Sequence, residues 1–205
     1  MLANLKITEY LSKAAAGTAV PGGGSVAALN AALAASLTEM VANLTVGKKG
    51  YEAVEEDMKD LAGKAAQLRS TLTAAIDKDA EAYTEVMAAY KLPKATGEEK
   101  ALRKQEIQDA IKHAALVPLE VAKEALQVLD LAGRAIRKGN KNAASDGAVA
   151  AMNARTAALA AIYNVKINLS SIKDDAFVEK LAQEVEDLQN QAAEKENEAL
   201  SYVEI

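Results

Sequence analysis

The sequence contains no cysteine and no tryptophan, and its only histidine is His113. The absence of cysteine excludes disulfides, thiolate metal sites and a cysteine nucleophile. A single histidine excludes a metal site built from several imidazoles, and we predict no bound metal. Aromatic residues make up only 3% of the chain while hydrophobic residues reach 50%, so alanine and aliphatic side chains supply most of the apolar surface.

This composition favours packed helices, because alanine is the best helix former and its small side chain lets helices approach closely. At 205 residues the chain fits one domain, residues 1–205, which can bury a core without metals or disulfides. No segment alternates between polar and apolar residues over a useful length, so we expect no sheet.

Charge and targeting signals narrow the function further. The net charge is −5, and no basic face with interleaved aromatic residues is present, which argues against a general nucleic-acid binder. Residues 1–6 lack the basic and apolar pattern of a signal peptide, so we expect a cytoplasmic protein. The most membrane-like segment, residues 26–44, contains Glu39, whose charge would cost about 2.5–3.5 kcal/mol at mid-bilayer. A buried helix fits this segment better than a membrane span, and no membrane partner is expected.

Glycine and proline mark most of the breaks between predicted helices. The helices are expected at residues 6–15, 25–44, 52–90, 97–138, 145–168 and 174–202. A capping box, Thr96-Gly97-Glu98-Glu99, starts the fourth helix, and Pro118 inside it should kink or divide it. The pattern predicts an all-α fold, a bundle of six to seven helices of which some are long.

Three consecutive glycines, Gly22 to Gly24, stand between Pro21 and Ser25 ahead of the second helix. Glycine lowers the stability of regular structure, so three in a row indicate a geometric requirement. One interpretation is a tight turn whose Ser25 side chain caps the helix. The other is a cluster of free amides at the positive end of a helix, which binds an anionic or carbonyl group of a ligand.

Asp77 and Asp79 lie two residues apart on the long third helix and therefore point about 200° apart. Asp77 shares its face with polar residues and is expected to be solvated. Asp79 falls within an apolar stripe, which runs Leu61, Ala65, Leu68, Leu72, Ile76, Asp79, Tyr83, Val86 and Tyr90. Burial would raise the pKa of the Asp79 carboxyl and suit it to move protons near neutral pH. A buried ion pair, or a cap on a neighbouring helix, is the alternative.

Polar residues recur on one face of the fifth predicted helix, namely Asp146, Asn153, Asn164 and Asn168. Buried amides need hydrogen-bond partners, which other helices or a heterocyclic ligand can supply. Asparagine provides both donor and acceptor and so suits a heterocycle that carries several donors and acceptors. Glu39, on a similar face of the second helix, is a secondary candidate.

Two basic clusters flank loops: Lys48 with Lys49, and Arg134 with Arg137, Lys138 and Lys141. A solvated surface is the simpler interpretation of both, and binding of ligand carboxylates is the other. His113 is expected to be structural or exposed rather than catalytic.

Ordered motifs extend over most of the chain. They are the segments 20–28, 40–41, 47–51, 77–80, 91–94, 117–119, 139–140, 145–146, 163–169 and 174–177. In residue type and order these segments resemble the cyclodeaminase domain of formiminotransferase-cyclodeaminase, a family that also contains stand-alone bacterial methenyltetrahydrofolate cyclohydrolases.

The resemblance implies an all-α homodimer that binds a tetrahydrofolate derivative as substrate in a cleft and uses no cofactor. It implies a catalytic acid in Asp77-Lys78-Asp79-Ala80, which we assign to Asp79 from its helical face, with Asp77 as the alternative. The residues expected to contact substrate are Pro21, Gly22, Gly23, Gly24, Ser25, Lys49, Asn142, Ser145, Asp146, Asn164 and Asn168. Asn153 has no counterpart in the resemblance and is a candidate from spacing alone.

Two reactions of this family involve the same carbon. The cyclodeaminase converts 5-formiminotetrahydrofolate to 5,10-methenyltetrahydrofolate and ammonia, whereas the cyclohydrolase uses water to open the methenyl bridge to 10-formyltetrahydrofolate. Because no transferase segment precedes the first motif, we favour the stand-alone cyclohydrolase. A non-catalytic helical scaffold or folate-binding protein is the alternative, and it predicts Asp79 paired in the core with no cleft near Gly22 to Gly24.

Overall fold

The computed structural model describes all 205 residues and contains six α-helices and no strand. The helices are α1 (Ile7–Ala14), α2 (Gly23–Asn43), α3 (Glu55–Tyr90), α4 (Gly97–Lys138), α5 (Ala144–Leu169) and α6 (Asp175–Ser201). Three short 3₁₀ turns accompany them, η1 (Leu2–Asn4), η2 (Glu52–Val54) and η3 (Lys141–Ala143). The all-α prediction is confirmed, and each predicted helix end lies within three residues of the observed one.

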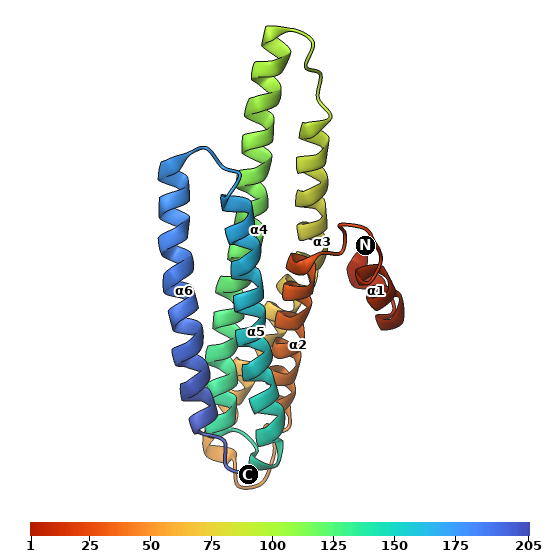
Figure 1. Cartoon of the computed structure of the whole chain (residues 1–205). Coiled ribbons are helices and arrows are strands. Elements are labelled where there is room, and N and C mark those ends of the chain that lie inside the picture. Colours follow the sequence, from red (N-terminus) through yellow and green to blue (C-terminus); the bar gives the residue numbers. More distant parts are fainter.

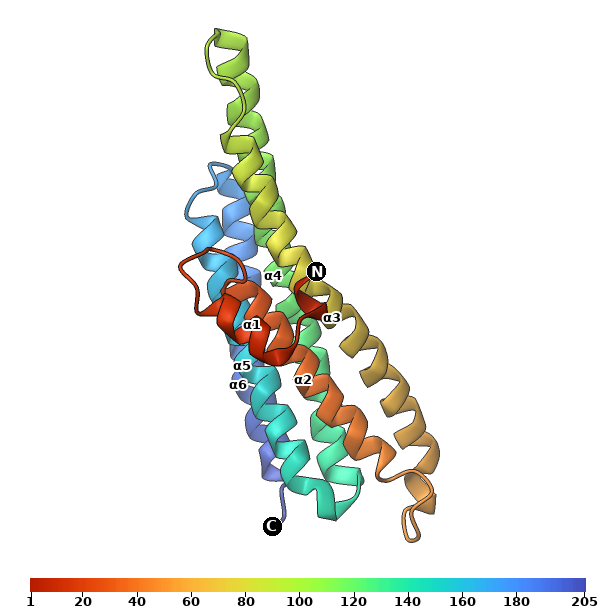
Figure 2. The ribbon, with the colours of Figure 1, turned by 90° about the vertical axis from the view of Figure 1, so that its right-hand side faces the viewer.

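The five long helices, α2 to α6, form the bundle, and α4 contacts the other four. Figure 1 shows that the α3–α4 hairpin extends beyond the ends of the remaining helices. The short helix α1 stands to one side of the bundle, near the N-terminal end of α2 (Figures 1 and 2). Only Tyr10 of α1 is buried, so this helix adds little to the core.

The centre of the bundle is built from alanine. On α2 the buried alanines are Ala27, Ala28, Ala31, Ala32, Ala34 and Ala35, and on α5 they include Ala150, Ala151, Ala154, Ala157, Ala158 and Ala161. Small side chains at a contact shorten the distance between helix axes, so α2 and α5 pack closely against each other. By length and composition α2 alone could cross a membrane, but 56% of that window is buried in the bundle, as in a core helix.

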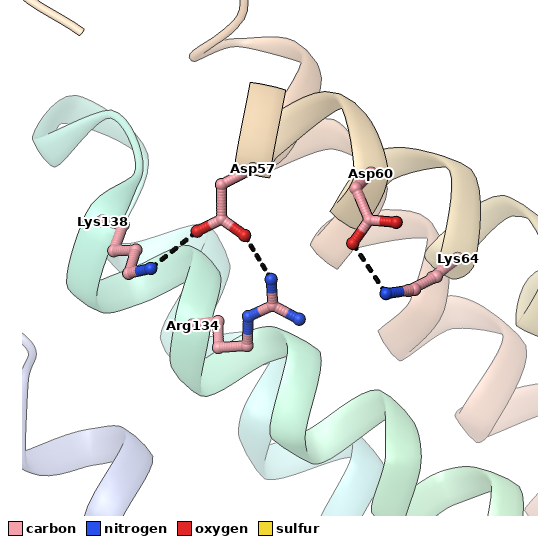
Figure 3. Close-up of polar contacts among 5 residues, drawn as sticks. All are labelled: Asp57, Asp60, Lys64, Arg134 and Lys138. Carbon is pink, nitrogen blue, oxygen red and sulfur yellow. Dashed lines mark hydrogen bonds and ion pairs between the residues drawn. The ribbon is translucent and has the colours of Figure 1, made fainter. Parts of the chain in front are cut away.

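Ion pairs join the start of α3 to the end of α4 (Figure 3). Asp57 accepts hydrogen bonds from Arg134 and, at 2.7 Å, from Lys138 Nζ. The acid lies in the first turn of α3 and the cations in the last turns of α4, where each charge also complements its own helix dipole. These two members of the predicted basic cluster therefore have a carboxylate partner within the protein.

Pro118 lies within an unbroken α4, so of the predicted kink or division of this helix the division is wrong. Proline has no N–H to donate to the carbonyl of Ala114, four residues earlier. Asn168 of α5 fills this gap, because its Nδ2 donates to Ala114 O at 2.9 Å and to Asn164 O at 3.0 Å. A side chain from a neighbouring helix thus satisfies the carbonyl that proline leaves free.

This contact predicts a coupled effect on stability. Asn168→Ala should lower the free energy of unfolding by about 1–3 kcal/mol, because a carbonyl loses its donor. In a Pro118→Ala background the same substitution should cost clearly less, because the new N–H of residue 118 bonds to Ala114 O. Urea denaturation of the four proteins of this double-mutant cycle measures the coupling. Equal costs in the two backgrounds would contradict it.

Candidate active site

The three glycines form the first turn of α2 rather than a loop before it. Gly22 is the N-cap, and Gly23, Gly24 and Ser25 are the first helical residues. The interpretation of Ser25 as the cap is therefore wrong, since its buried Oγ lies 2.9 Å from both Ile76 O and Asp79 Oδ2. The Ser25 hydroxyl has one proton and donates it to one of these two acceptors at a time. Both acceptors belong to α3, so Ser25 links α2 to α3 by a hydrogen bond.

Asp79 of α3 lies directly against this turn. A Cβ at Gly24 would collide with Asp79 Oδ1, and a Cβ at Gly23 would lie 3.1 Å from Asn164 Nδ2. Only glycine leaves room for these two side chains to approach the backbone so closely. The requirement for glycine thus comes from a carboxyl and an amide that α3 and α5 bring to the end of α2.

The environment of Asp79 opposes its ionisation. Burial raises the pKa of the Asp79 carboxyl above its usual value, and hydrogen bonds from the Ser25 side chain and backbone partly offset the rise. The positive end of α2 acts in the same direction as these donors. The pKa of Asp79 is therefore higher in the folded protein than in the unfolded chain. The contribution of neutral Asp79 to the free energy of unfolding is complete at a pH below the unfolded-state pKa, and it is lost as the pH rises through the folded-state pKa.

A cavity of about 300 Å³ opens at this helix end. It brings together Gly22 to Gly24, Asp79, Asn164 and Asn168, all predicted from the sequence as site residues. Its other lining residues are Ala19, Val20, Ala82, Tyr83, Val86, Tyr90, Ile111, Ala114, Ile167 and Ser171. Pro21 and Ser25 are buried beside it without lining it. The arrangement has one titratable carboxyl, backbone amides at a helix start and amide side chains on mainly apolar walls, which is typical of a small-molecule site.

A larger groove of about 410 Å³ lies between α3 and α4. Lys78, His113 and four glutamates line it, and none of the residues predicted to bind substrate lies there. His113 is exposed, as predicted, with Nδ1 2.8 Å from Glu85 Oε2. We therefore place the candidate active site in the smaller cavity, where the predicted residues converge.

The other predicted contacts, Lys49, Asn142, Ser145 and Asp146, lie at the opposite end of α5. Asp146 and Asn164 are 18 residues apart on one helix, which corresponds to about 27 Å. Of this second group Asn142 contacts Asn140, whose Oδ1 accepts from Asn142 N at 3.1 Å and from Lys48 Nζ at 2.7 Å. Within one chain the structure does not bring the two groups together.

The environment of Asp77 differs from the expected one. Asp77 is only 9% exposed, so the prediction that it is solvated is wrong. Its carboxyl accepts hydrogen bonds from the backbone N–H groups of Leu2 and, at 3.3 Å, Ala3, because the N-terminal segment folds over this face of α3. Asp77 does not line the cavity. It therefore caps η1, whereas Asp79 faces the site.

The remaining candidates lie outside the cavity. Glu39 is 2.8 Å from Arg69 in an ion pair, and Asn153 does not line the cavity. Lys141 pairs with Glu204 at 2.6 Å, and the Arg137 guanidinium lies 5.4 Å from the ring centroid of Tyr202. These basic residues and Glu39 thus contact protein groups.

Tyr10 is a residue that the sequence pattern did not single out. Its side chain is 6% exposed, and its buried hydroxyl has no hydrogen-bond partner in the protein. Burial first, and then the negative charges of Asp79 and Asp77, raise the pKa of the Tyr10 phenol. Tyr10 thus adds a buried polar group near Asp79 and Asp77 of α3. A lone tyrosine in a short helix gives no sequence signal for this position.

Three comparisons place the chain among known proteins. Residues 6–187 match the sequence model of the formiminotransferase-cyclodeaminase family. The chain is 44% identical to a methenyltetrahydrofolate cyclohydrolase of Methylorubrum extorquens, over 92% of this chain and 90% of that protein. It is 34% identical to the formimidoyltransferase-cyclodeaminase of Rattus norvegicus, over 93% of this chain but only 35% of that longer protein.

The fold is also similar to a solved structure. The crystal structure of a formiminotetrahydrofolate cyclodeaminase from Thermotoga maritima superposes with a TM-score of 0.89 at 32% identity. The alignment covers 99% of this chain and 98% of the other. Nearly the whole helical arrangement is therefore common to both.

Two glycine substitutions test the close approach of Asp79 to α2. Gly63→Ala, on an open face of α3, should stabilise the protein by up to about 1 kcal/mol, as alanine does inside helices. Gly24→Ala should destabilise it instead, because the new methyl group displaces the Asp79 carboxyl. Thermal denaturation of both variants measures the difference. A Gly24→Ala variant as stable as Gly63→Ala would mean that the contact does not exist.

Proposed function

The chain belongs to the formiminotransferase-cyclodeaminase family, and from this premise we propose that it acts at the methenyl bridge between N5 and N10 of tetrahydrofolate. It is an enzyme of folate one-carbon chemistry. The reaction that we propose first is that of a methenyltetrahydrofolate cyclohydrolase. The 44% identity to a protein of that name, over most of both chains, carries this choice.

The second candidate is the cyclodeaminase reaction on 5-formiminotetrahydrofolate. The Thermotoga maritima protein of that description supports it, because its fold matches over nearly the whole chain. Both reactions pass through a tetrahedral carbon between N5 and N10. The same site can therefore serve either one, and the proposal for the chemistry of Asp79 covers both.

In the cyclohydrolase direction Asp79 is the general acid and base. Its carboxylate takes a proton as water adds to the methenyl carbon, and the carboxylic acid then protonates N5 as the bond between N5 and that carbon breaks. The hydroxyl proton of the tetrahedral carbon leaves to solvent, so one proton is released overall. A carboxyl with a raised pKa suits both steps, because it holds and releases a proton nearer to neutral pH.

The other groups at the cavity position the folate. Asn164 and Asn168 donate their amide hydrogens to the carbonyls of Ala160 and Ala114, which fixes both side chains and leaves their Oδ1 atoms to accept from pterin N–H groups. Amides of the first turn of α2 face carbonyl or anionic groups of the substrate. This placement needs no metal and no cofactor. It lowers the barrier by orientation, together with the proton transfer by Asp79.

A non-catalytic scaffold fits the structure less well, because it requires Asp79 to lie away from any cleft near Gly22 to Gly24. Asp79 contacts Gly24 and Ser25 and lines the cavity there. We also propose that the chain, residues 1–205, acts as a single domain and assembles as a homodimer.

Purified protein assayed with methenyltetrahydrofolate and, separately, with 5-formiminotetrahydrofolate tests the proposed function. A cyclohydrolase makes the methenyl absorbance fall, and a cyclodeaminase makes it rise. Asp79→Asn should keep the fold but lose turnover by about 10²–10⁴-fold, the usual contribution of a general acid or base. The matched control Asp77→Asn, two residues away, should keep most of the activity.

Wild-type protein that turns over neither folate would overturn the proposal. Asp79→Asn with full activity would remove Asp79 from the mechanism. If Asp77→Asn instead loses turnover while its thermal stability is unchanged, the general acid and base would be Asp77.

A further inference from the structure

The cavity at Asp79 continues outward along α3 as a stripe of apolar side chains. Tyr83, Val86 and Tyr90 follow Asp79 at intervals of four, three and four residues, and all of them line the cavity. This spacing places them on one face of the helix, and the distance along the helix from Asp79 to Tyr90 is about 16 Å. The stripe leads from the start of α2 into the α3–α4 hairpin, which extends beyond the other helices (Figure 1).

Two aromatic rings belong to this stripe, although aromatic residues are scarce in the chain. It has six tyrosines and one phenylalanine, and two of the tyrosines, Tyr83 and Tyr90, line this one cavity. They are 41% and 46% exposed, so neither is a residue of the buried core. A partly exposed ring on a cavity wall offers flat apolar surface on which the aromatic ring of a ligand can stack.

Arg103 of α4 adds a positive charge at the outer end of the stripe. Its guanidinium lies 5.7 Å from the centroid of the Tyr90 ring, and its Nε and Nη2 donate to Tyr90 O at 3.3 and 3.0 Å. Three of its five N–H groups remain available for an anion. Arg103 makes no ion pair with a carboxylate of the chain. It caps the last residue of α3, and it is also free to bind an anionic group of a ligand.

The order of chemical groups along the cavity matches their order along a folate. The cavity is polar at Asp79, aromatic along α3 and cationic at its outer end, whereas a folate carries a polar pterin, an aminobenzoyl ring and a glutamate. We propose that the substrate lies along α3, with its aminobenzoyl ring on Tyr83 and Tyr90 and its glutamate carboxylates at Arg103. An extended aminobenzoylglutamate is of the same order of length as the stripe. The inference rests on the proposed folate function, which puts the one-carbon bridge at Asp79.

In this arrangement the three residues bind substrate and take no part in the chemistry. They contact the aminobenzoyl ring and the glutamate, which do not change while the one-carbon bridge reacts. The enzyme therefore binds these parts equally well in the ground state and in the transition state. Loss of such a contact raises KM and leaves kcat nearly unchanged, whereas loss of the Asp79 carboxyl lowers kcat. The ratio of the two effects separates a binding residue from a catalytic one.

Steady-state kinetics of a small set of variants tests this placement. Tyr83→Ala and Tyr90→Ala should each raise KM for methenyltetrahydrofolate about 10-fold, because a stacked ring is lost. Tyr90→Phe keeps the ring and should keep the wild-type KM. Leu116→Ala is the matched control, since it removes another partly exposed apolar side chain that lines the larger groove and not this cavity. Unchanged KM in both alanine variants, or equal defects in Tyr90→Phe and Tyr90→Ala, overturns the aromatic contact.

The same assay with a second substrate isolates the role of Arg103. Methenyltetrahydropteroate is the same molecule without its glutamate. Arg103→Gln should raise KM for methenyltetrahydrofolate about 10-fold and leave KM for the pteroate unchanged, because the lost interaction requires the carboxylates. Lys104→Gln removes the same charge from the next residue and should change neither KM. If Arg103→Gln changes both KM values equally, or changes neither, Arg103 only caps α3 and the glutamate lies elsewhere.

Turnover by the wild-type protein distinguishes failure of this inference from failure of the proposed function. A wild-type protein that turns over neither methenyltetrahydrofolate nor 5-formiminotetrahydrofolate overturns the proposed function. An active wild-type protein whose KM is insensitive to the substitutions of Tyr83, Tyr90 and Arg103 overturns only the placement of the substrate along α3.

Discussion

The contact between Asp79 and the first turn of α2 is the constraint on which the rest of the site depends. The carboxyl lies where a side chain on Gly24 would be, and the hydroxyl of Ser25, in the same turn, is within hydrogen-bond distance of it. Burial disfavours its charge, while the Ser25 hydrogen bonds and the helix end favour it. These opposing effects leave a carboxyl that is fixed in position and binds its proton more tightly than an exposed aspartate does.

The bundle makes this contact possible by letting helices approach closely. Alanine in the centre brings α2 and α5 together, so Asn164 of α5 reaches Gly23 of α2, next to the glycine that Asp79 contacts. The same end of α5 supplies Asn168, which satisfies the carbonyl that Pro118 frees in α4. Asn168 thus makes a hydrogen bond that stabilises the fold and also lines the cavity. Substitutions there will affect stability and binding together.

Most of the helix ends and the place of Asp79 in the site could be predicted from local sequence patterns. Glycine, proline and the Thr96 capping box placed the helix ends, and the apolar stripe on α3 singled out Asp79. Other features depend on contacts between distant segments and left no local signal. Asp77 is buried only because the N-terminal segment folds over it, and Pro118 is tolerated only because Asn168 comes from another helix. Asp146 and Asn164 lie far apart because α5 is one uninterrupted helix. The helix range expected from the sequence, residues 145–168, already implied this separation.

The central claim is that burial raises the pKa of the Asp79 carboxyl and that this group moves the proton. The most direct measurement is a carbon-13 NMR titration of its carboxyl, assigned by the signal that Asp79→Asn removes. The account predicts a midpoint above the ordinary aspartate value of 3.8, matching the pH below which kcat/KM falls. A midpoint at or below 3.8, or an activity profile that does not follow the Asp79 titration, would contradict it.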